Sequence, residues 1–298
     1  MTPTVGFIIL THNKPHQIIR LLNTLNRMFN CPPIVCHHDF SKSELPVDIL
    51  SRNVLLVHPH LQTGWGEFSV VEAMLRALQL MYETPTSPDW FILLSGSDYP
   101  IKPAKQILQD LASSPYDVHI SHEQINYNAY ERDWQKQCYE RYCTIKFRVP
   151  FLNRKLLLIK RVVTLRHPLL TAPFLPFSKN LRCFAGEHWF CANRKAAKYL
   201  IEFHSTRPTL ASHYRRLEDF ETISPDESYY QTIFCNAPHL KISKNHWRYI
   251  DWSTNGAHPK TLLLEDLPKI HASSAHFARK FDTNEDVRIL NELDAIVG

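Results

Sequence analysis

The chain has 298 residues, of which 44% are apolar and 21% charged, close to the averages for globular proteins. These values exclude a disordered chain, a collagen and a coiled coil. The sequence holds no run of about 18 uncharged apolar residues, and residues 1–10 lack the basic start of a signal peptide. We therefore expect neither a membrane anchor nor a cleaved leader. The formal charge of +5 is too small to indicate nucleic-acid binding by itself.

The first third of the chain alternates buried strands with amphipathic helices. Residues 5–10 form an apolar run rich in β-branched residues, and apolar residues at helical spacing follow from Ile18 to Leu25. A second helix is predicted over residues 68–82, and the strand pattern recurs at residues 34–39, 54–58 and 90–94. This order predicts an α/β fold whose mainly parallel sheet is flanked by helices on both faces.

Ligands bind parallel sheets beyond the carboxyl ends of the strands. The loops expected at that edge are residues 12–15, 37–41, 59–67 and 95–100. The regular pattern ends after residue 120 and resumes at residues 184–192, with helices predicted over 194–204 and from Pro225. No Gly/Ser-rich linker or repeat interrupts the chain, so we interpret residues 1–298 as one domain in which residues 121–183 are an insertion shaping an acceptor cleft.

Cysteine and charge are distributed unevenly. Seven cysteines are an odd number and include no CxxC pair, which favours free thiols in the cytosol. Residues 141–186 hold ten Lys and Arg and no Asp or Glu. This basic insertion either is solvated or rests on an anionic membrane through residues 146–166, where apolar residues are interleaved.

The common cofactor motifs are missing. There is no GxxxxGK[ST] loop, HExxH, DxD or GxSxG, and Gly64-Trp65-Gly66 has no strand directly before it. His37-His38-Asp39, and His119 with His122-Glu123, come nearest to a metal site, but hydrogen-bonded loop histidines are commoner than ligands at strand ends. We therefore expect no metal and no cofactor.

Two acidic loops leave alternatives open. Asp98, in Ser95-Gly96-Ser97-Asp98, is either a turn former or a ligand-binding carboxylate. In Ser224-Pro225-Asp226-Glu227, Ser and Glu are spaced as a helix capping box, and Glu227 is equally suited to be a general base held at the start of a helix.

Five ordered motifs give the sequence a family resemblance. They are Gly64-Trp65-Gly66-Glu67, Ser95-Gly96-Ser97-Asp98-Tyr99-Pro100-Ile101-Lys102, Gly186-Glu187-His188-Trp189-Phe190, Ser224-Pro225-Asp226-Glu227-Ser228 and Phe277-Ala278-Arg279-Lys280-Phe281-Asp282. In this order and spacing, they resemble the core-2/I-branching enzymes of glycosyltransferase family 14, which also contains the peptide O-xylosyltransferases.

The resemblance implies a GT-A-type, Rossmann-like fold and a metal-independent, inverting transfer of a sugar from a UDP-sugar to a glycan hydroxyl. It assigns the general base to Glu227. It also assigns neutralisation of the UDP diphosphate to Lys280 and Lys260, with Arg279 as the neighbouring alternative. UDP-GlcNAc is expected somewhat ahead of UDP-xylose as donor.

The resemblance also suggests weaker site positions. For nucleotide or donor contacts they are Asp98, Asp39 and His12. For acceptor and cleft contacts they are Trp247, Tyr249, Glu187, Trp189, Arg132, Lys136 and Arg141. Because the chain begins at the first strand, it looks like a bacterial, cytoplasmic member acting on a glycan or lipid-linked glycan. The alternative is a sugar- or nucleotide-sugar-binding protein without turnover on the same fold; a nucleic-acid partner is not expected.

Overall fold

The computed structural model describes residues 2–85, 87–127, 133–152, 158–254, 256 and 258–298. Within them, seven strands form the central sheet in the order β12-β6-β11-β4-β1-β2-β3. β1 runs parallel to β2 and β4, and β3 runs parallel to β2. The α/β fold with a mainly parallel sheet, predicted from the sequence, is confirmed.

The central strands are β1 (Val5–Thr11), β2 (Ile34–His38), β3 (Val54–Leu56), β4 (Trp90–Ser95), β6 (Val118–Ile120), β11 (Phe190–Asn193) and β12 (Ile242–Ser243). The other strands are β5 (Asp98–Pro100), β7 (Glu123–Gln124), β8 (Ile145–Leu152), β9 (Leu158–Leu165), β10 (Phe184–Ala185), β13 (Arg248–Ile250) and β14 (Phe277–Arg279). The α-helices are α1 (Pro15–Phe29), α2 (Phe68–Glu83), α3 (Ala104–Ser113), α4 (Asp133–Tyr142), α5 (Pro168–Thr171), α6 (Arg194–Thr206), α7 (Pro208–Glu218), α8 (Tyr229–Cys235), α9 (Leu267–Ala272) and α10 (Arg288–Val297). Short 3₁₀-helices are η1 (Val47–Ile49), η2 (Ala172–Phe174), η3 (Pro225–Glu227) and η4 (Leu264–Asp266).

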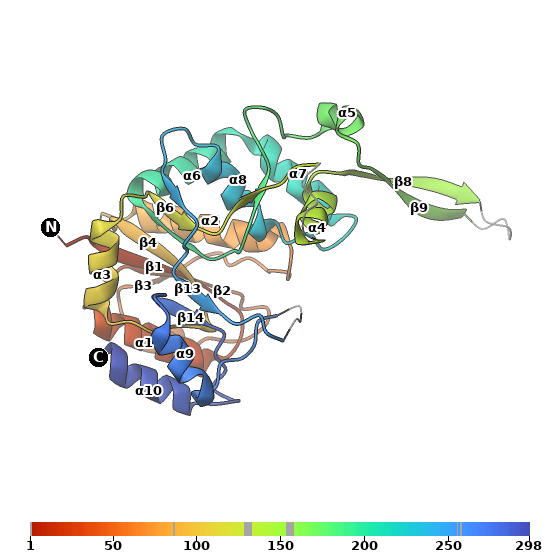
Figure 1. Ribbon diagram of the computed structural model, residues 1–298. Coiled ribbons are helices and arrows are strands. Elements are labelled where there is room, and N and C mark those ends of the chain that lie inside the picture. The colour runs from red at the N-terminus through yellow and green to blue at the C-terminus, as the bar shows by residue number, and fades with distance from the viewer. Residues whose placement is uncertain (1, 86, 128–132, 153–157, 255, 257) are drawn as a thin grey trace.

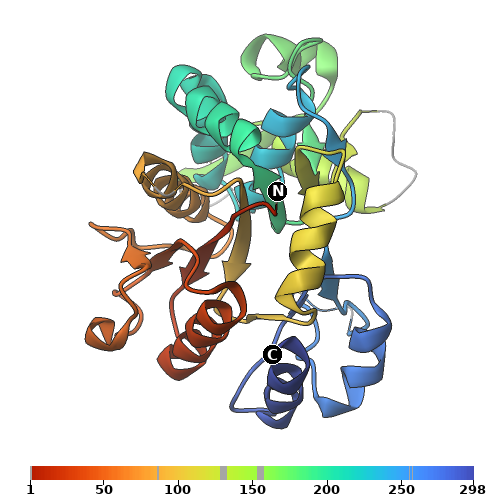
Figure 2. The ribbon, with the colours of Figure 1, turned by 90° about the vertical axis from the view of Figure 1, so that its left-hand side faces the viewer.

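Helices cover both faces of the central sheet. Side chains alternate along β1, so that Phe7 and Ile9 pack in one core with α1, α3 and α10, and Ile8 packs in the other with α2, α6 and α8. Figures 1 and 2 show α1 and α10 on one side of the sheet and α2 and α6 on the other. A strand buried on both faces must be apolar throughout, which is why residues 5–10 read as one continuous run.

The second half of the sheet differs from the simplest parallel arrangement. β11 lies between β4 and β6 and is antiparallel to both. Apolar composition does not distinguish the two directions, because a strand buried on both faces needs apolar residues in either. The alternating region predicted at residues 184–192 is divided into β10 and β11, with residues 186–189 as a loop between them.

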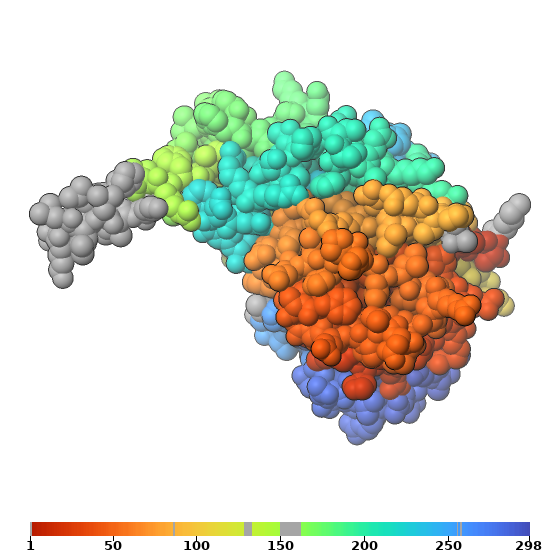
Figure 3. Space-filling model, turned by 180° about the vertical axis from the view of Figure 1, so that it is seen from behind, coloured from red at the N-terminus to blue at the C-terminus, as the bar shows by residue number. Residues whose placement is uncertain are grey.

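The C-terminal chain returns to the end of β4 through a second sheet. β14 lies between β13 and β5, with Arg279 opposite Asp98 in the register. Phe281 N–H donates to Ser97 O at 2.9 Å. In Figure 3 the C-terminal segment, in blue, lies directly against the N-terminal part of the chain, in red and orange. Residues 279–282 therefore reach the carboxyl ends of the central strands.

Within residues 121–183, β8 and β9 form an antiparallel hairpin that extends away from the body of the molecule (Figure 1). At its base, Lys146 forms an ion pair with Glu221, and the Arg148 guanidinium donates to the backbone oxygen of Asp219. Two of the basic side chains in this segment thus have partners inside the protein.

Phe147 and Val149 on β8 and Val162 on β9 are exposed apolar residues of the same hairpin. Residues 153–157 lie outside the described residues, so the membrane contact predicted for residues 146–166 stays a prediction. None of the described helices has the length and apolarity needed to span a bilayer.

The loop between β10 and β11 packs closely against the backbone of Ser121 at Gly186, and a substitution at Gly186 tests this packing. A Cβ at this position would lie 2.0 Å from the backbone oxygen of Ser121, and the Gly186 N–H donates to Glu227 O at 2.8 Å. Gly186→Ala should therefore lower the free energy of unfolding by about 1–3 kcal/mol in urea denaturation. Gly256→Ala is the control, because its Cβ would meet nothing closer than 3.6 Å. Equal losses in both variants would contradict the close approach at Gly186.

Candidate functional site

A cavity of about 560 Å³ opens at the carboxyl ends of β1 and β4. The chain continues from β1 to β2 and β3 on one side, while β4 pairs with β1 on the other, so the strand order reverses at this point. Ligands of open α/β sheets bind at such reversals. The four loops expected at this edge all contribute to the lining, through residues that include His12, His37, Thr63 and Ser95.

The side of the cavity next to β2 is built around the buried carboxylate of Asp39. Thr63 donates to its Oδ2 from the backbone at 2.8 Å and from the hydroxyl at 2.9 Å, and the Ser41 hydroxyl donates to Oδ1 at 2.6 Å. Burial acts to raise the pKa of Asp39, but these hydrogen bonds outweigh burial and hold the pKa well below its usual range. Asp39 is therefore a fixed negative charge that shapes the loop and lies behind the cavity wall.

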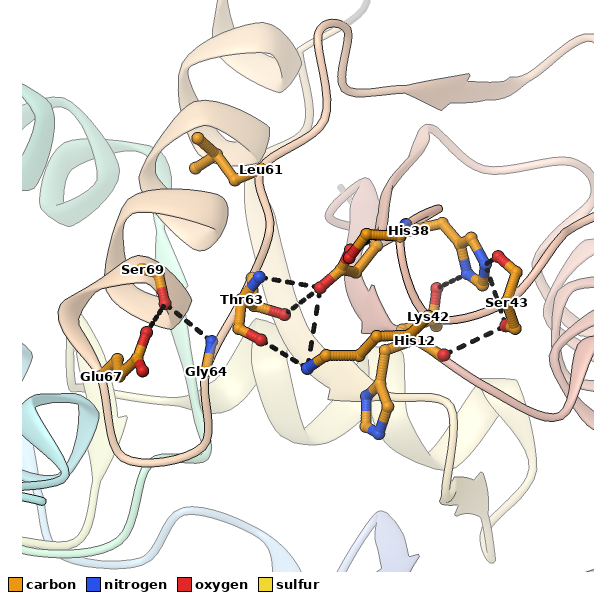
Figure 4. A network of polar contacts seen from close by, with 12 residues as sticks. His12, His38, Lys42, Ser43, Leu61, Thr63, Gly64, Glu67 and Ser69 are labelled. Carbon is orange, nitrogen blue, oxygen red and sulfur yellow. Dashed lines mark hydrogen bonds and ion pairs between the residues drawn. The ribbon is translucent and has the colours of Figure 1, made fainter.

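Lys42 and His12 lie in front of Asp39 and line the cavity. Figure 4 shows the Lys42 side chain extending to Thr63, whose backbone oxygen accepts its hydrogen bond, with the His12 ring beside it. The His12 backbone oxygen accepts a hydrogen bond from Ser43 Oγ at 3.0 Å, which holds the loop. Burial, with the nearby charge of Lys42, lowers the pKa of His12, so its imidazole is neutral at pH 7.

The segment that follows β1 and the end of β14 add positive charge to the cavity wall. Lys14, Arg279 and Lys280 line the cavity together with Lys42. Lys14 forms an ion pair with Asp282 and directly precedes α1, whose positive N-terminal end therefore lies at the cavity. Among the described residues Lys280 has no ion-pair partner, which leaves its ammonium group available to an anion.

Glu227 lies on the wall formed by η3. Its Oε2 is 3.1 Å from Arg141 Nη1, and its side chain is 41% exposed, toward the cavity that it lines. Burial and the neighbouring charge of Asp226 raise the pKa of Glu227 to about 7, and Arg141 acts in the opposite direction. A carboxyl with this pKa can take up a proton and release it near neutral pH.

The structure excludes the capping box as one of the two alternatives for residues 224–227. Ser224 has a left-handed backbone with φ 46°, and no side-chain cap bond forms. The only link between the two residues is from the Glu227 N–H to Ser224 O at 3.0 Å, so the Glu227 carboxylate is free of a capping role and faces Arg141. Left-handed backbone is unfavourable for a residue other than Gly, and such strain is common at functional sites.

The loop between β10 and β11 supplies Glu187, His188 and Trp189 to the lining. Glu187 Oε2 lies 2.9 Å from His246 Nε2, and its Oε1 accepts a hydrogen bond from Trp252 Nε1 at 3.1 Å. Burial acts to raise the pKa of Glu187, but the hydrogen bond with His246 outweighs it and the pKa is lowered. Glu187 is thus an ionised residue held in place by His246 and Trp252.

Asp98 and Trp247 were expected in the site, but both pack inside the protein outside the cavity. The Asp98 carboxylate is fully buried, accepts a hydrogen bond from Ser95 N at 2.7 Å and lies 3.7 Å from Arg248 Nε. Trp247 is stacked between His119 and His276, with ring centroids 3.8 and 4.3 Å apart. Neither Asp98 nor Trp247 lines the cavity.

Tyr249 and Lys260 also lie outside the cavity lining. Tyr249 is on β13 and packs against the core on the α1 side of the sheet. Lys260 Nζ lies 2.8 Å from both carboxylate oxygens of Asp266, and this contact raises its pKa. The positive charge of Lys260 is therefore balanced by Asp266 and not directed into the cavity.

The three basic residues expected to contact the acceptor, Arg132, Lys136 and Arg141, are not brought together among the described residues. Arg141, at the end of α4, contacts Glu227. Lys136 lies on the exposed side of the same helix. Arg132 lies outside the described residues.

Several lining residues were not singled out from the sequence: Lys14, Lys42, Trp65, His188, Asp226, Trp252 and His258. Lys14 and Trp65 lie in loops already expected at the strand ends, so their position was a usable signal. His188 and Asp226 stand beside assigned residues within the quoted motifs. His258 stands two residues before Lys260, which the family resemblance assigned to the diphosphate. Trp252 carries no such signal, because the irregular segment after β13 predicts no side-chain direction.

Among the described residues, no group of three or more His, Cys, Asp and Glu is arranged to hold a metal ion. All seven cysteines belong to this part of the chain and are free, and Cys31 is the exposed one.

These features define a doubly wound α/β protein with a ligand cavity at its strand-order reversal, lined by cations on the β1 and β14 side and by a high-pKa carboxyl on η3. A sequence profile of the Core-2/I-Branching enzyme family matches residues 5–271, and the chain belongs to this family.

The chain has relatives of low sequence identity in plants and mammals. The chain is 26% identical over 230 residues to beta-glucuronosyltransferase GlcAT14A of Arabidopsis thaliana, covering 76% of this chain and 46% of that protein. It is 24% identical over 319 residues to xylosyltransferase 1 of Rattus norvegicus, covering 98% of this chain and 35% of that protein. The chain thus spans less than half the length of these relatives.

The contact between Arg141 and Glu227 can be tested by titration. Arg141→Met removes the cation and keeps a long side chain, so the pKa of Glu227 should rise from about 7 by about one further unit. The measurement is ¹³C NMR of labelled glutamate carboxyls, assigned with Glu227→Gln. Arg166→Met, which removes an exposed cation paired with Glu140, should leave this titration unchanged. An unchanged or lower Glu227 pKa in the Arg141 variant would show that the ion pair does not form in solution.

Proposed function

We propose that this protein is an inverting glycosyltransferase that moves a sugar from a UDP-sugar to a hydroxyl of a glycan acceptor. The observation that carries the proposal is Glu227: a cavity-facing carboxyl with a pKa of about 7, in a cavity whose other walls carry Lys14, Lys42 and Lys280. The first group suits proton abstraction, and the second suits a diphosphate.

In the proposed reaction, the acceptor hydroxyl gives its proton to Glu227 while its oxygen attacks the anomeric carbon of the donor. The bond between that carbon and the phosphate oxygen breaks, and UDP leaves from the opposite face, which inverts the configuration. Glu227 acts in its ionised form, which Arg141 favours at 3.1 Å. The proton then passes to solvent, because the cavity is open.

The leaving UDP gains negative charge as the glycosidic phosphate bond breaks, and fixed cations stabilise that charge. Lys280 is the foremost candidate because it lines the cavity and has no ion-pair partner among the described residues. Lys14 and the positive N-terminal end of α1 add to the positive potential that would stabilise the diphosphate. Lys260, which the family resemblance also assigns to the diphosphate, would have to leave Asp266 to reach it.

Two exposed indoles offer flat surfaces for a sugar at the rim of the cavity. Trp65 is 66% exposed and Trp252 is 45% exposed, and both line the cavity. Sugar rings stack on such aromatic faces. We assign these two residues the acceptor-binding role that the sequence suggested for Trp247 and Tyr249.

The variant Glu227→Gln distinguishes a role in catalysis from a role in binding. This variant keeps the size of the side chain but replaces the carboxylate base by a neutral amide, so the transfer rate should fall at least about a thousandfold while UDP affinity stays within twofold. The measurement is release of UDP during transfer, together with calorimetry. A wild-type protein that binds UDP and transfers no sugar would instead support the alternative, a nucleotide-sugar-binding protein.

Metal-independent binding is tested by calorimetry of UDP in excess EDTA, with and without added Mn²⁺. UDP should bind equally in both, because lysines neutralise the diphosphate. Lys280→Ala should weaken UDP affinity about tenfold or more. Lys105→Ala, an exposed lysine on α3, is the matched control and should have no effect. Binding that requires Mn²⁺, or an unchanged affinity in Lys280→Ala, would show that the charge assignment is wrong.

A further inference from the structure

The β8–β9 hairpin has two chemically different faces. Opposed residues of an antiparallel pair lie on the same face, and every second residue along a strand returns to that face. The register places Phe147 opposite Val163 and Ile145 opposite Leu165, and Val149 follows Phe147 on the same face. All five of these residues are apolar, and we call the surface that they form the apolar face of the hairpin.

The opposite face of the hairpin contacts the body of the protein. Lys146 forms an ion pair with Glu221, and the Arg148 guanidinium donates to the backbone oxygen of Asp219. The Arg148 guanidinium carbon also lies 5.2 Å from the centre of the Phe220 ring. These contacts hold the hairpin on the segment that follows α7. The apolar face is on the other side of the two strands and is therefore directed away from that segment.

The described part of the chain leaves the apolar face incompletely covered. Phe147 and Val149 are exposed, and β8 and β9 form a two-stranded sheet of their own. Such a hairpin is only marginally stable in water unless a further strand or another element packs on one face. Figure 1 shows both strands projecting away from the molecule. The apolar face is therefore suited to a partner outside the chain.

Exposed apolar residues are not confined to this one face. Val162 lies on the opposite face of the hairpin and is exposed. The helices α5 and η2, which follow β9, expose Leu169 (82%), Leu170 and Phe174 (63%). No other stretch of similar length in the described chain exposes as many large apolar residues as residues 147–174. A protein partner would cover one side of the hairpin, whereas a lipid interface surrounds the segment that enters it, so this distribution favours lipid.

The charge of this part of the chain indicates which kind of lipid it binds. Residues 141–186 hold ten Lys and Arg and no Asp or Glu. Of these cations, Lys179 and Arg182 are exposed and have no ion-pair partner among the described residues. A second copy of the chain would bring the same positive charge against this surface, whereas anionic headgroups attract it. Apolar residues beside an excess of cations are typical of segments that lie at anionic membrane interfaces.

We propose that the β8–β9 hairpin, together with α5 and η2, docks on an anionic lipid bilayer. The outer edges of the hairpin carry backbone groups that pair with no other strand, so the hairpin lies among the headgroups and does not enter the hydrocarbon. The docking surface is joined to the cavity by α4. β8 begins three residues after α4 ends, and Arg141 of α4 contacts Glu227. Docking therefore links the cavity wall that carries Glu227 to the bilayer through one helix.

The first test is co-sedimentation of the wild-type protein with vesicles of phosphatidylcholine, either pure or with about a third of phosphatidylglycerol. Docking is independent of UDP binding, so no substrate is needed. At low salt the protein should bind the anionic vesicles at least about tenfold more tightly than the neutral ones, and high salt should weaken this binding because it screens the charges. Equal binding to both kinds of vesicle overturns the proposal. So does a protein that binds no anionic vesicles, whether or not it forms a dimer in sedimentation equilibrium.

Two double variants test the residues themselves. Phe147→Ser with Val149→Ser changes the apolar face of the hairpin, and Leu169→Ser with Leu170→Ser changes α5, outside the hairpin, so that misfolding of the hairpin cannot explain both results. Each should lower binding to anionic vesicles at least about fivefold, because less apolar area leaves water on docking. The urea unfolding midpoint should stay at the wild-type value, since all four side chains are exposed.

The matched control is Val47→Ser with Ile49→Ser, which changes two exposed apolar residues on η1, outside the proposed surface. This variant should bind anionic vesicles as the wild-type protein does. Wild-type binding in either of the two test variants, or an equal loss of binding in the control, overturns the proposal.

Discussion

The carboxylate of Asp98 is fully buried at the point where the end of β4 meets β5, β13 and β14. It faces two guanidinium groups: that of Arg248, whose Nη2 also donates to Leu93 O at 2.6 Å, and that of Arg279, opposite it in the register. Burying any one of these charges alone would cost several kcal/mol, so each is tolerated only because the others are present. This cluster joins the N-terminal sheet to the returning C-terminal chain. The position of Lys280, one residue beyond β14, depends on it.

The cavity carries lysines on one wall and the Glu227 carboxyl on another, and the two tasks proposed for it require this separation of charge. Lysines from the segments that follow β1, β2 and β14 gather where a diphosphate would need compensation. Burial and the neighbouring carboxylate of Asp226, in contrast, raise the pKa of Glu227. Arg141 limits that effect, since without a cation nearby a half-buried carboxyl beside Asp226 would hold its proton more firmly. The helix α4 within residues 121–183 thus contributes electrostatically to a residue of η3, far from it in the sequence.

Much of the fold could be predicted from the sequence because buried parallel strands require continuous apolar runs, and residues 5–10 and 90–94 leave little alternative. The position of the cavity followed from the strand ends alone. Side-chain direction could not be predicted in the same way. Trp247 and Lys260 stand in sequence contexts that suit a site, yet one is stacked between histidines and the other is bound to Asp266, contacts made by residues distant in sequence or on a separate turn. The capping-box spacing of Ser224 and Glu227 was ambiguous for a related reason: only the structure shows that Ser224 is left-handed and makes no side-chain cap bond.

The return of the C-terminal chain to β4 has a consequence for biosynthesis. The cavity lining begins at Leu10 and ends at Asp282, so the first wall leaves the ribosome when most of the chain is still to be made. β1, β2 and β4 can pair early, but the wall carrying Arg279 and Lys280 is added only after β14 emerges, near the end of synthesis. A nascent chain therefore has a sheet without a complete binding site. A premature stop before β14 removes the wall that carries Arg279 and Lys280, however much of the central sheet has already formed.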